Sequence, residues 1–323
     1  MLAHDPDIEL MTEVSALYYL HDVTQAQLSE RYRISRSKIW RMLKRAREIG
    51  LVDIQVRANP NAARHLEAEM ARRFGLSRLL AAIDHPNAAT QRLAVAGLVA
   101  AHLDQILSDG MVVAVGMGRN VSTVTEVPGT PRARSVVFAS AIGGSVRGGE
   151  TINADHIARR LASRFGGRSE TLYAPAVVSS REVREALIQN ETVKDTLDRA
   201  RRADVALIGL GDLSEDSNLI RMGWFSPQEV TGARVSGTVG DMMGHDFLDI
   251  EGKSSRDIMG GRVIGLTLEE LRPIRNVVAI ASESTKTAII LAALRTGMVN
   301  TLATSLANAS AVVALDDATR GRA

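Results

Sequence analysis

The chain has 323 residues, of which 45% are apolar and 24% are charged, and 39 basic against 37 acidic residues leave a net charge of +2. The length is about twice that of a common domain, so we expect two domains, and the ordinary composition excludes a disordered or fibrous protein. The absence of cysteine excludes disulfide frameworks, thiolate metal sites and cysteine nucleophiles. An acidic N-terminus and apolar runs shorter than about 20 residues predict a cytoplasmic chain that does not enter a membrane.

Three helices and a strand are predicted within residues 8–56. The helix over residues 8–20 should turn one apolar stripe inward, formed by Leu10, Val14, Leu17 and Leu20. Thr24 and Gln27 have the spacing of a capping box, so a second helix should run over residues 25–32. Ser35 caps a third helix over residues 36–49, which Gly50 would end in a left-handed conformation. The alternating residues 51–56 then predict a strand, which is typical of a winged helix-turn-helix.

The segment from Arg31 to Arg47, which contains most of the third helix, has eight basic residues and no acidic one. Such a run is most often a solvated helix face, but here two caps, a short turn and a following strand accompany it. Together they favour docking into the major groove of double-stranded DNA, with arginines reading bases and Lys44 on a phosphate. Trp40 could equally pack at the edge of the core. The residues expected to face DNA are Arg36, Ser37, Lys38, Trp40, Arg41 and Lys44.

The remainder of the chain reads as an α/β domain. Residues 58–61, with the sequence Ala-Asn-Pro-Asn, break the pattern and should link a DNA-binding domain of residues 1–57 to a second domain of residues 58–323. Predicted strands lie at 79–83, 111–115, 136–141, 205–210, 277–281 and 301–304, and predicted helices at 66–74, 90–107, 153–165, 181–200 and 284–296. This alternation predicts a doubly wound, mostly parallel sheet, in which ligands bind beyond the carboxyl ends of strands where the strand order reverses.

A glycine turn follows the second of these strands, with the sequence Gly116-Met117-Gly118-Arg119-Asn120. Its glycines let the backbone approach a ligand, the next helix offers amides to an anion, and Arg119 adds positive charge. A lone G-x-G also suits any tight turn, so a ligand role and a structural role stay equally open. The turn lacks the Gly-Lys-Ser/Thr of a Walker motif, and Val121 fills the last glycine position of the dinucleotide fingerprint. Nucleotide and NAD binding are therefore disfavoured.

Other glycine pairs follow other strands, at Gly143-Gly144 and at Gly209 with Gly211, so several loops could converge on one edge of the sheet. Lys286 falls in the first turn of a predicted helix, where a cation is normally unfavourable. An anionic ligand would offset that cost, although a lysine that reaches solvent explains the position as well.

Several short segments of the sequence, taken together and in their order along the chain, are typical of one known family. They are Thr24-Gln25 with Leu28, Ser35-Arg36 through Leu43, Ala46-Arg47, residues 50–52, 115–119, 203–211, Gly240-Asp241 with Phe247 and Asp249, and residues 262–266, 286–289 and 293–295. In this combination the chain resembles, over nearly its whole length, the SorC family of bacterial transcriptional regulators, a sugar-binding group that includes a DeoR-like member from bacilli. The resemblance implies an N-terminal winged helix-turn-helix and an effector domain similar to ribose-5-phosphate isomerase and glucosamine-6-phosphate deaminase.

The resemblance also implies effectors that are phosphorylated sugars or related polyols. By position, the effector's phosphate would lie in a cradle made by Gly116, Gly118, Arg119 and Asn120. Asp241, Glu283 and Lys286 would be nearby polar contacts. This sequence departs from the family pattern in three places. Asn120 replaces a frequent Thr, Ser282-Glu283 replaces Gly-Gly, and Ser305 replaces a frequent Asp.

The leading hypothesis is a DNA-binding transcriptional regulator of a carbohydrate catabolic operon, a homodimer or homotetramer whose operator affinity is set by a sugar, sugar phosphate or polyol. The alternative is a sugar-phosphate isomerase or deaminase with an N-terminal extension, which needs a base and a partner acid. Asp241, Glu283 and His245 do not form a convincing catalytic cluster, so we expect no catalytic residue, no metal site and no cofactor. A third possibility, a DNA-binding protein whose second domain only oligomerises, does not require so many glycine loops.

Overall fold

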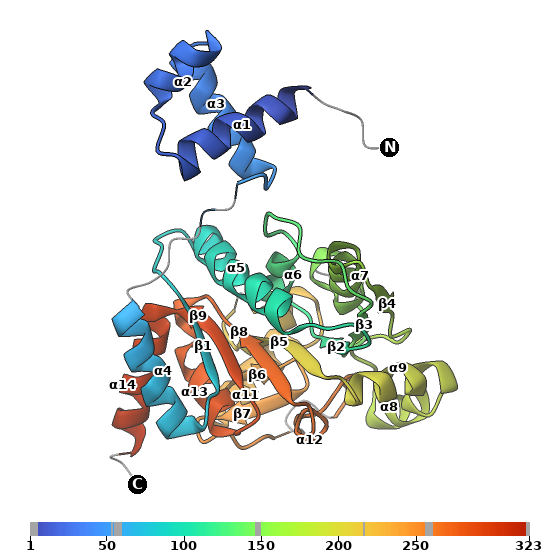
Figure 1. The fold of residues 1–323 in the computed structure, drawn as a ribbon. Coiled ribbons are helices and arrows are strands. Elements are labelled where there is room, and N and C mark those ends of the chain that lie inside the picture. The colour runs from blue at the N-terminus through green and yellow to red at the C-terminus, as the bar shows by residue number, and fades with distance from the viewer. Residues whose placement is uncertain are drawn as a thin grey trace. The chain divides into compact units, whose positions relative to one another are not determined.

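The computed structural model describes residues 6–52, 54, 60–145, 150–215, 217–255 and 261–320. The chain divides into two compact units (Figure 1). The first comprises residues 1–56 grouped with Pro128–Thr130, and the second comprises Arg57–Val127 and Pro131–Ala323. Within the described ranges, no helix is both long enough and apolar enough to cross a bilayer.

The first unit is built from α1 (Pro6–Leu20), α2 (Gln25–Tyr32) and α3 (Arg36–Glu48). The predicted caps are confirmed: Thr24 and Gln27 form the capping box of α2, and the Ser35 hydroxyl accepts a hydrogen bond from the Lys38 amide. Gly50 follows α3 with a φ of +77°, the left-handed conformation expected of it. The three helices close over a small core made of Val14, Leu28, Ile39 and Leu43.

Two expectations for this unit were wrong in part. Leu20 is 76% exposed, because it ends α1 at the turn, and Val23 packs against the core in its place. In the segment predicted as the wing strand, Leu51, Val52 and Ile54 adopt no strand, and residues 53, 55 and 56 lie outside the described residues. Of the predicted linker, residues 58 and 59 also lie outside them, while Pro60 begins a helix, a first position that proline tolerates well.

The second unit contains a mostly parallel sheet, as the sequence predicts. Its parallel strands follow the order β1-β9-β8-β5-β2-β3-β4. Their bounds are β1 (Arg78–Ala82), β2 (Val112–Val115), β3 (Val137–Ser140), β4 (Arg168–Glu170), β5 (Val205–Asp212), β8 (Asn276–Ile280) and β9 (Thr301–Ser305). Two further strands, β6 (Thr238–Met242) and β7 (Asp246–Asp249), continue antiparallel from the end of β5. The chain runs outward from β2 to β4 and returns to β5 on the other side of β2, so the strand order reverses between β2 and β5.

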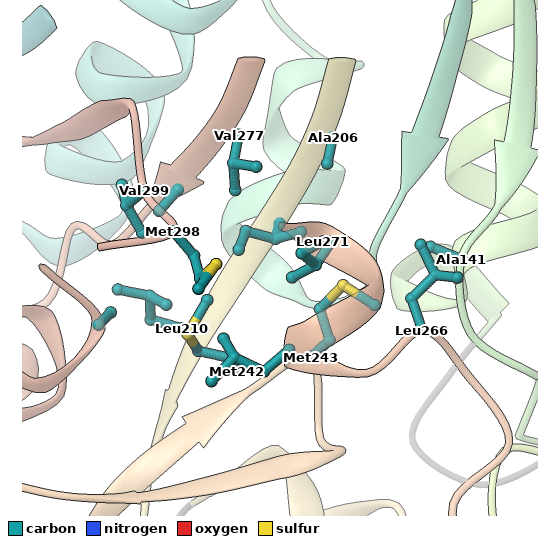
Figure 2. Packing of buried hydrophobic residues seen from close by; sticks show 14 of the residues in the cluster. Ala141, Ala206, Leu210, Met242, Met243, Leu266, Leu271, Val277, Met298 and Val299 are labelled. Atoms are coloured by element: carbon teal, nitrogen blue, oxygen red, sulfur yellow. The ribbon is translucent and has the colours of Figure 1, made fainter. Parts of the chain in front are cut away.

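Helices cover both faces of this sheet (Figure 1). On one side lie α5 (Ala88–Ile106), α6 (Arg119–Val124) and α7 (Ala154–Phe165), and on the other α4 (Pro60–Phe74), α9 (Glu191–Arg201), α13 (Thr287–Arg295) and α14 (Leu306–Arg320). Successive residues of β5 pack alternately on the two faces of the sheet. Val205 and Leu207 belong to the core under α5–α7, and Ala206 and Ile208 belong to the core on the opposite face. Figure 2 shows members of that second core, including Leu210 of β5 and Met242 at the end of β6.

The remaining elements are short: the 3₁₀ turns η1 (Glu150–Ile152) and η3 (Ser284–Lys286), and the helices α8 (Arg181–Ile188), α10 (Asn218–Arg221), α11 (Pro227–Val235) and α12 (Leu268–Leu271). The single helix predicted over residues 181–200 is two, α8 and α9, because the Asn190 side chain caps the start of α9. The helix predicted from residue 284 begins instead as η3 and becomes α-helical only at Thr287.

Candidate functional site

The six residues predicted to face DNA are all exposed on α3, while the apolar stripe of the same helix is buried. Trp40 is 51% exposed and lies outside the buried cluster of the first unit, which argues against the core-edge alternative. The Lys44 ammonium lies 5.5 Å from the centroid of the Trp40 ring. The Arg41 side chain donates to the Ser37 carbonyl oxygen at 3.4 Å. The helix therefore presents one basic surface with a single aromatic ring in it.

In the second unit, the predicted glycine turn contains two glycines with different roles. Gly116 donates to the Leu207 carbonyl oxygen at 2.8 Å, and a Cβ at this position would lie 3.1 Å from the same oxygen. Gly116 is thus needed for the close packing of β2 on β5. Gly118 has a φ of +109°, a backbone conformation that residues other than glycine rarely adopt, and it precedes the first turn of α6.

A pocket of about 620 Å³, including space open to solvent, lies at this turn, where the strand order reverses. It is lined by residues from the turn after β2, the end of β5, the segment 217–224, the β6–β7 turn and η3. Five of the seven residues predicted to bind an effector line it, namely Gly118, Arg119, Asn120, Asp241 and Lys286. The other two, Gly116 and Glu283, do not: Gly116 is occupied with strand packing, and Glu283 lies behind Asn120 and Lys286.

Three lining residues carry a buried polar atom that has no hydrogen-bond partner among the described residues. They are Ser217 Oγ, Trp224 Nε1 and Asp241 Oδ1, and the three residues are only 5%, 6% and 4% exposed. An unpaired buried donor or acceptor costs on the order of 1–3 kcal/mol, so three in one pocket call for a partner. The sequence reading missed Ser217 and Trp224 because no motif surrounds them; the rarity of tryptophan in this chain was the one available signal.

Asp241 owes its position to two glycines. A Cβ on Gly211, its partner across β5 and β6, would lie 2.1 Å from Asp241 Oδ1, so a larger residue there would displace the carboxylate. The Gly244 amide donates to the other carboxylate oxygen. Burial raises the pKa of Asp241 to about 6, and the nearby charge of Lys286 only partly offsets this effect. At neutral pH the carboxylate is mostly ionised and can accept a hydrogen bond.

Lys286, which lines the pocket, forms an ion pair with the part-buried Glu283. The Lys286 ammonium lies 3.1 Å from Glu283 Oε2 and donates to the Leu210 carbonyl oxygen at 2.7 Å. Glu283 also accepts from Asn120 Nδ2 at 2.8 Å and pairs with Arg92 at 3.2 Å. Burial opposes ionisation of Glu283, but these cations and the Asn120 amide lower its pKa to about 2. Glu283 is therefore fully charged at neutral pH.

Two other sequence features lie apart from the pocket lining. A Cβ on Gly143 would lie 2.6 Å from the Ala174 carbonyl oxygen, so this glycine permits close backbone packing. His245 Nδ1 lies 3.3 Å from Asp246 Oδ2, and neither residue lines the pocket. Asp241, Glu283 and His245 consequently do not meet around one cavity as a catalytic acid and base would. In the described ranges, no three histidine or carboxylate side chains gather as a metal site would require.

Comparison with known proteins shows which family this chain is similar to. Residues 58–314 match the Sugar-bind family, which is described as a sugar-binding domain. The transcriptional regulator LsrR of Klebsiella pneumoniae subsp. pneumoniae is 31% identical over 316 residues, which cover 95% of this chain and 93% of that protein.

Two solved structures extend the likeness. The sugar-binding domain of a transcriptional repressor from Vibrio fischeri is 47% identical, with a TM-score of 0.73 over 78% of this chain and 99% of that one. The full-length sorbitol operon regulator SorC from Klebsiella pneumoniae is 27% identical, with a TM-score of 0.77 over 96% of this chain and 100% of that one. The likeness to SorC therefore includes both units of this chain.

Proposed function

This chain belongs to the SorC family of sugar-binding transcriptional regulators, and we propose that it controls a carbohydrate catabolic operon through the effect of a small carbohydrate on its affinity for operator DNA. It is a transcriptional regulator and not an isomerase or deaminase, because its relatives over the whole length are regulators. The observation that carries the proposal is the pocket with three unpartnered buried polar atoms, in a chain whose α3 exposes a basic surface.

We propose that the DNA-binding domain comprises residues 1–57 and is a winged helix-turn-helix that places α3 in the major groove. Arg36, Ser37 and Arg41 would contact base edges, while Lys38 and Lys44 would contact phosphates. Trp40 would add a stacking or methyl contact. The exposure of all six side chains supports this assignment. One such unit covers few base pairs, so we expect a homodimer or homotetramer, acting in the cytoplasm, whose units bind related half-sites.

We propose that residues 58–323 form the effector-binding domain, with a sugar, sugar phosphate or polyol as the effector and with the isomerase- and deaminase-like fold of the family. Gly118, Arg119 and Asn120, where α6 begins, would contact one end of the effector. Asp241 and Lys286 would contact its hydroxyl groups. The common location of these five residues around one pocket supports the assignment.

Band-shift titration on the DNA upstream of the regulated operon tests the proposal. We expect salt-dependent binding of the full-length protein, and a change in affinity when a panel of sugars, polyols and sugar phosphates is added. A protein that binds no such DNA at low salt, or that turns over a sugar phosphate faster than buffer does, would contradict the proposed function.

A further inference from the structure

We propose that the effector is an uncharged polyhydroxylated molecule, a polyol or a free sugar, and that its phosphate ester binds more weakly, because Glu283 neutralises the lysine of the pocket within the protein itself. This inference rests on the proposed function and narrows the class of effector. It depends on the charges around the pocket, on the donors that Lys286 has left, and on the chemistry of the three unpartnered atoms.

The charges around the pocket balance. Among the described lining residues, the cations Arg119 and Lys286 stand against the carboxylates Asp212 and Asp241. Directly behind the lining, Glu283 adds a further carboxylate, which is itself paired with Arg92. A phosphate ester carries up to two negative charges and needs a surplus of cations or amide donors to replace its hydration shell. The charges of the described lining residues leave no such surplus of cations.

Lys286 has little left to offer an anion. Its side chain is only 11% exposed, its ammonium donates to the Leu210 carbonyl oxygen at 2.7 Å, and it lies 3.1 Å from Glu283 Oε2. A lysine ammonium has three donors, so two are used by the protein and one is available. One donor with a compensated charge suits a hydroxyl oxygen better than it suits a phosphate. Arg119, the remaining lining cation, is part-exposed, and solvent screens its charge.

The unpartnered atoms complement hydroxyl groups. Trp224 Nε1 can only donate, ionised Asp241 Oδ1 can only accept, and Ser217 Oγ can do both. A hydroxyl group both donates and accepts, so neighbouring hydroxyls of one polyol can satisfy all three atoms. A phosphate group at physiological pH accepts without donating, so a phosphate placed against Asp241 would leave that carboxylate unpaired and would add a like charge beside it.

Glu283 is held in place by Asn120, which is itself held by Ser282. Ser282 Oγ donates to Asn120 Oδ1 at 2.6 Å, and Asn120 Nδ2 donates to Glu283 Oε2 at 2.8 Å. Ser282, Asn120 and Glu283 thus form one hydrogen-bonded chain that ends at Lys286. Their joint effect is to fix a negative charge against the pocket's lysine, which makes Glu283 a positioning residue rather than an effector contact.

Matched pairs of ligands test the inference on the full-length protein. The probes are four- to six-carbon polyols and free sugars, each beside its own monophosphate ester, with dissociation constants measured by calorimetry at pH 7.5. We expect at least one uncharged member to bind at least about ten times more tightly than its ester. If the tighter member of every binding pair is the ester, or if no pair binds at all, the inference is wrong.

The variant Glu283→Gln tests the cause. It keeps an acceptor for Asn120 but removes the charge opposite Lys286, so the ratio of ester to parent affinity should rise at least about tenfold. Glu270→Gln is the matched control, because Glu270 also pairs with an arginine, Arg201 at 2.8 Å, but lies outside the pocket lining. An unchanged ratio in a folded Glu283→Gln protein would contradict the inference.

Should Glu283→Gln fail to fold, the wild-type pairs still decide the question. Operator binding in a band shift is measured separately, so failure of the effector class and failure of the proposed function are distinguishable. A protein that binds its operator and prefers the ester retains the proposed function and refutes this inference.

Discussion

The basic surface of α3 and the pocket of the second unit differ in the exposure and the charge balance of their polar side chains. On α3 the polar groups come from a single helix and are exposed to water, and their charges add up. In the pocket the polar groups come from five separate segments, are largely buried, and carry charges that cancel. The first arrangement suits a polymeric anion bound at its surface, and the second suits a small ligand that replaces water completely.

The largest effect is expected from removing base contacts on α3. The double variant Arg36→Ala/Arg41→Ala should weaken operator binding by about 2–6 kcal/mol, since each arginine that contacts a base contributes about 1–3 kcal/mol. Effector affinity should stay within a factor of about two. Fluorescence anisotropy with labelled operator measures the loss, and Lys194→Ala/Arg202→Ala, which removes two exposed cations of the second unit, serves as the control. Equal losses in both double variants would mean that α3 supplies only general charge.

The buried carboxylate of the pocket should have the next largest effect, on stability. The folded-state pKa of Asp241 is raised to about 6 from an ordinary value of 3.8, so the folded protein binds the proton more tightly than the unfolded chain. This group therefore costs stability in full above pH 6 and progressively less as the pH falls toward 4. Asp241→Asn should raise the free energy of unfolding at pH 7.5 by up to about 3 kcal/mol, and should flatten its pH dependence between pH 4 and 6.

Denaturant titrations across this pH range measure the effect, and the exposed Asp195→Asn should leave the profile unchanged. A destabilised Asp241→Asn protein with the wild-type pH profile would show that Asp241 does not titrate near 6. The same variant should bind the effector more weakly, since the amide cannot reproduce the charge of the acceptor. On α3, by contrast, no substitution of an exposed cation should alter stability by more than about 0.5 kcal/mol.

A smaller effect is expected at the glycine turn. Gly118→Ala places a side chain at a φ of +109°, so the turn must rearrange and the effector should lose its contacts with this turn. We expect the effector-induced change in operator affinity, typically about 1–3 kcal/mol, to disappear while effector-free operator binding persists. Gly97→Ala, in the middle of α5 with no atom within 4 Å of the added Cβ, is the control. A wild-type response from Gly118→Ala would place the effector elsewhere.

The smallest effect is expected from Lys44. Its ammonium lies over the Trp40 ring and 3.9 Å from Glu48, so it is already partly engaged on the protein surface. Lys44→Ala should weaken all DNA sequences alike, by about 1 kcal/mol or less, and should reduce the salt dependence of binding by about one counterion. Binding isotherms at several salt concentrations measure both. A selective loss for the operator sequence would mean that Lys44 contacts a base.

The two regions also differ in how far the sequence predicts them. The caps of α2 and α3 and the apolar stripe of α3 depend on residues within four positions of one another, so local patterns were enough to place them. The core strands of the sheet were predicted for a similar reason, because each is a short run of buried apolar residues. β4, β6 and β7 were missed, since polar residues or glycine leave them few or no apolar positions, and they become strands only through pairing with a neighbour.

The pocket was predicted only in part, because its parts meet through tertiary structure. The glycine turn is recognisable by its two glycines after a strand, and Lys286 is recognisable as a cation in the first turn of a predicted helix. Residues of the turn and Lys286 both line the pocket. Glu283 was expected to contact the effector, yet it lies behind the lining in a network with Arg92 that spans 191 residues of sequence. Ser217 and Trp224 lie in no motif, and apart from the rarity of tryptophan only their burial without a partner reveals them.

The central claim is that effector and operator binding are coupled within one protein, and reciprocity tests it most directly. The change in operator affinity at saturating effector is measured by anisotropy, and the change in effector affinity at saturating operator by calorimetry. The account predicts the same factor in both directions, within the range of about 5–150 that is typical of coupled sites. A ligand that occupies the pocket but leaves operator affinity unchanged would contradict the account.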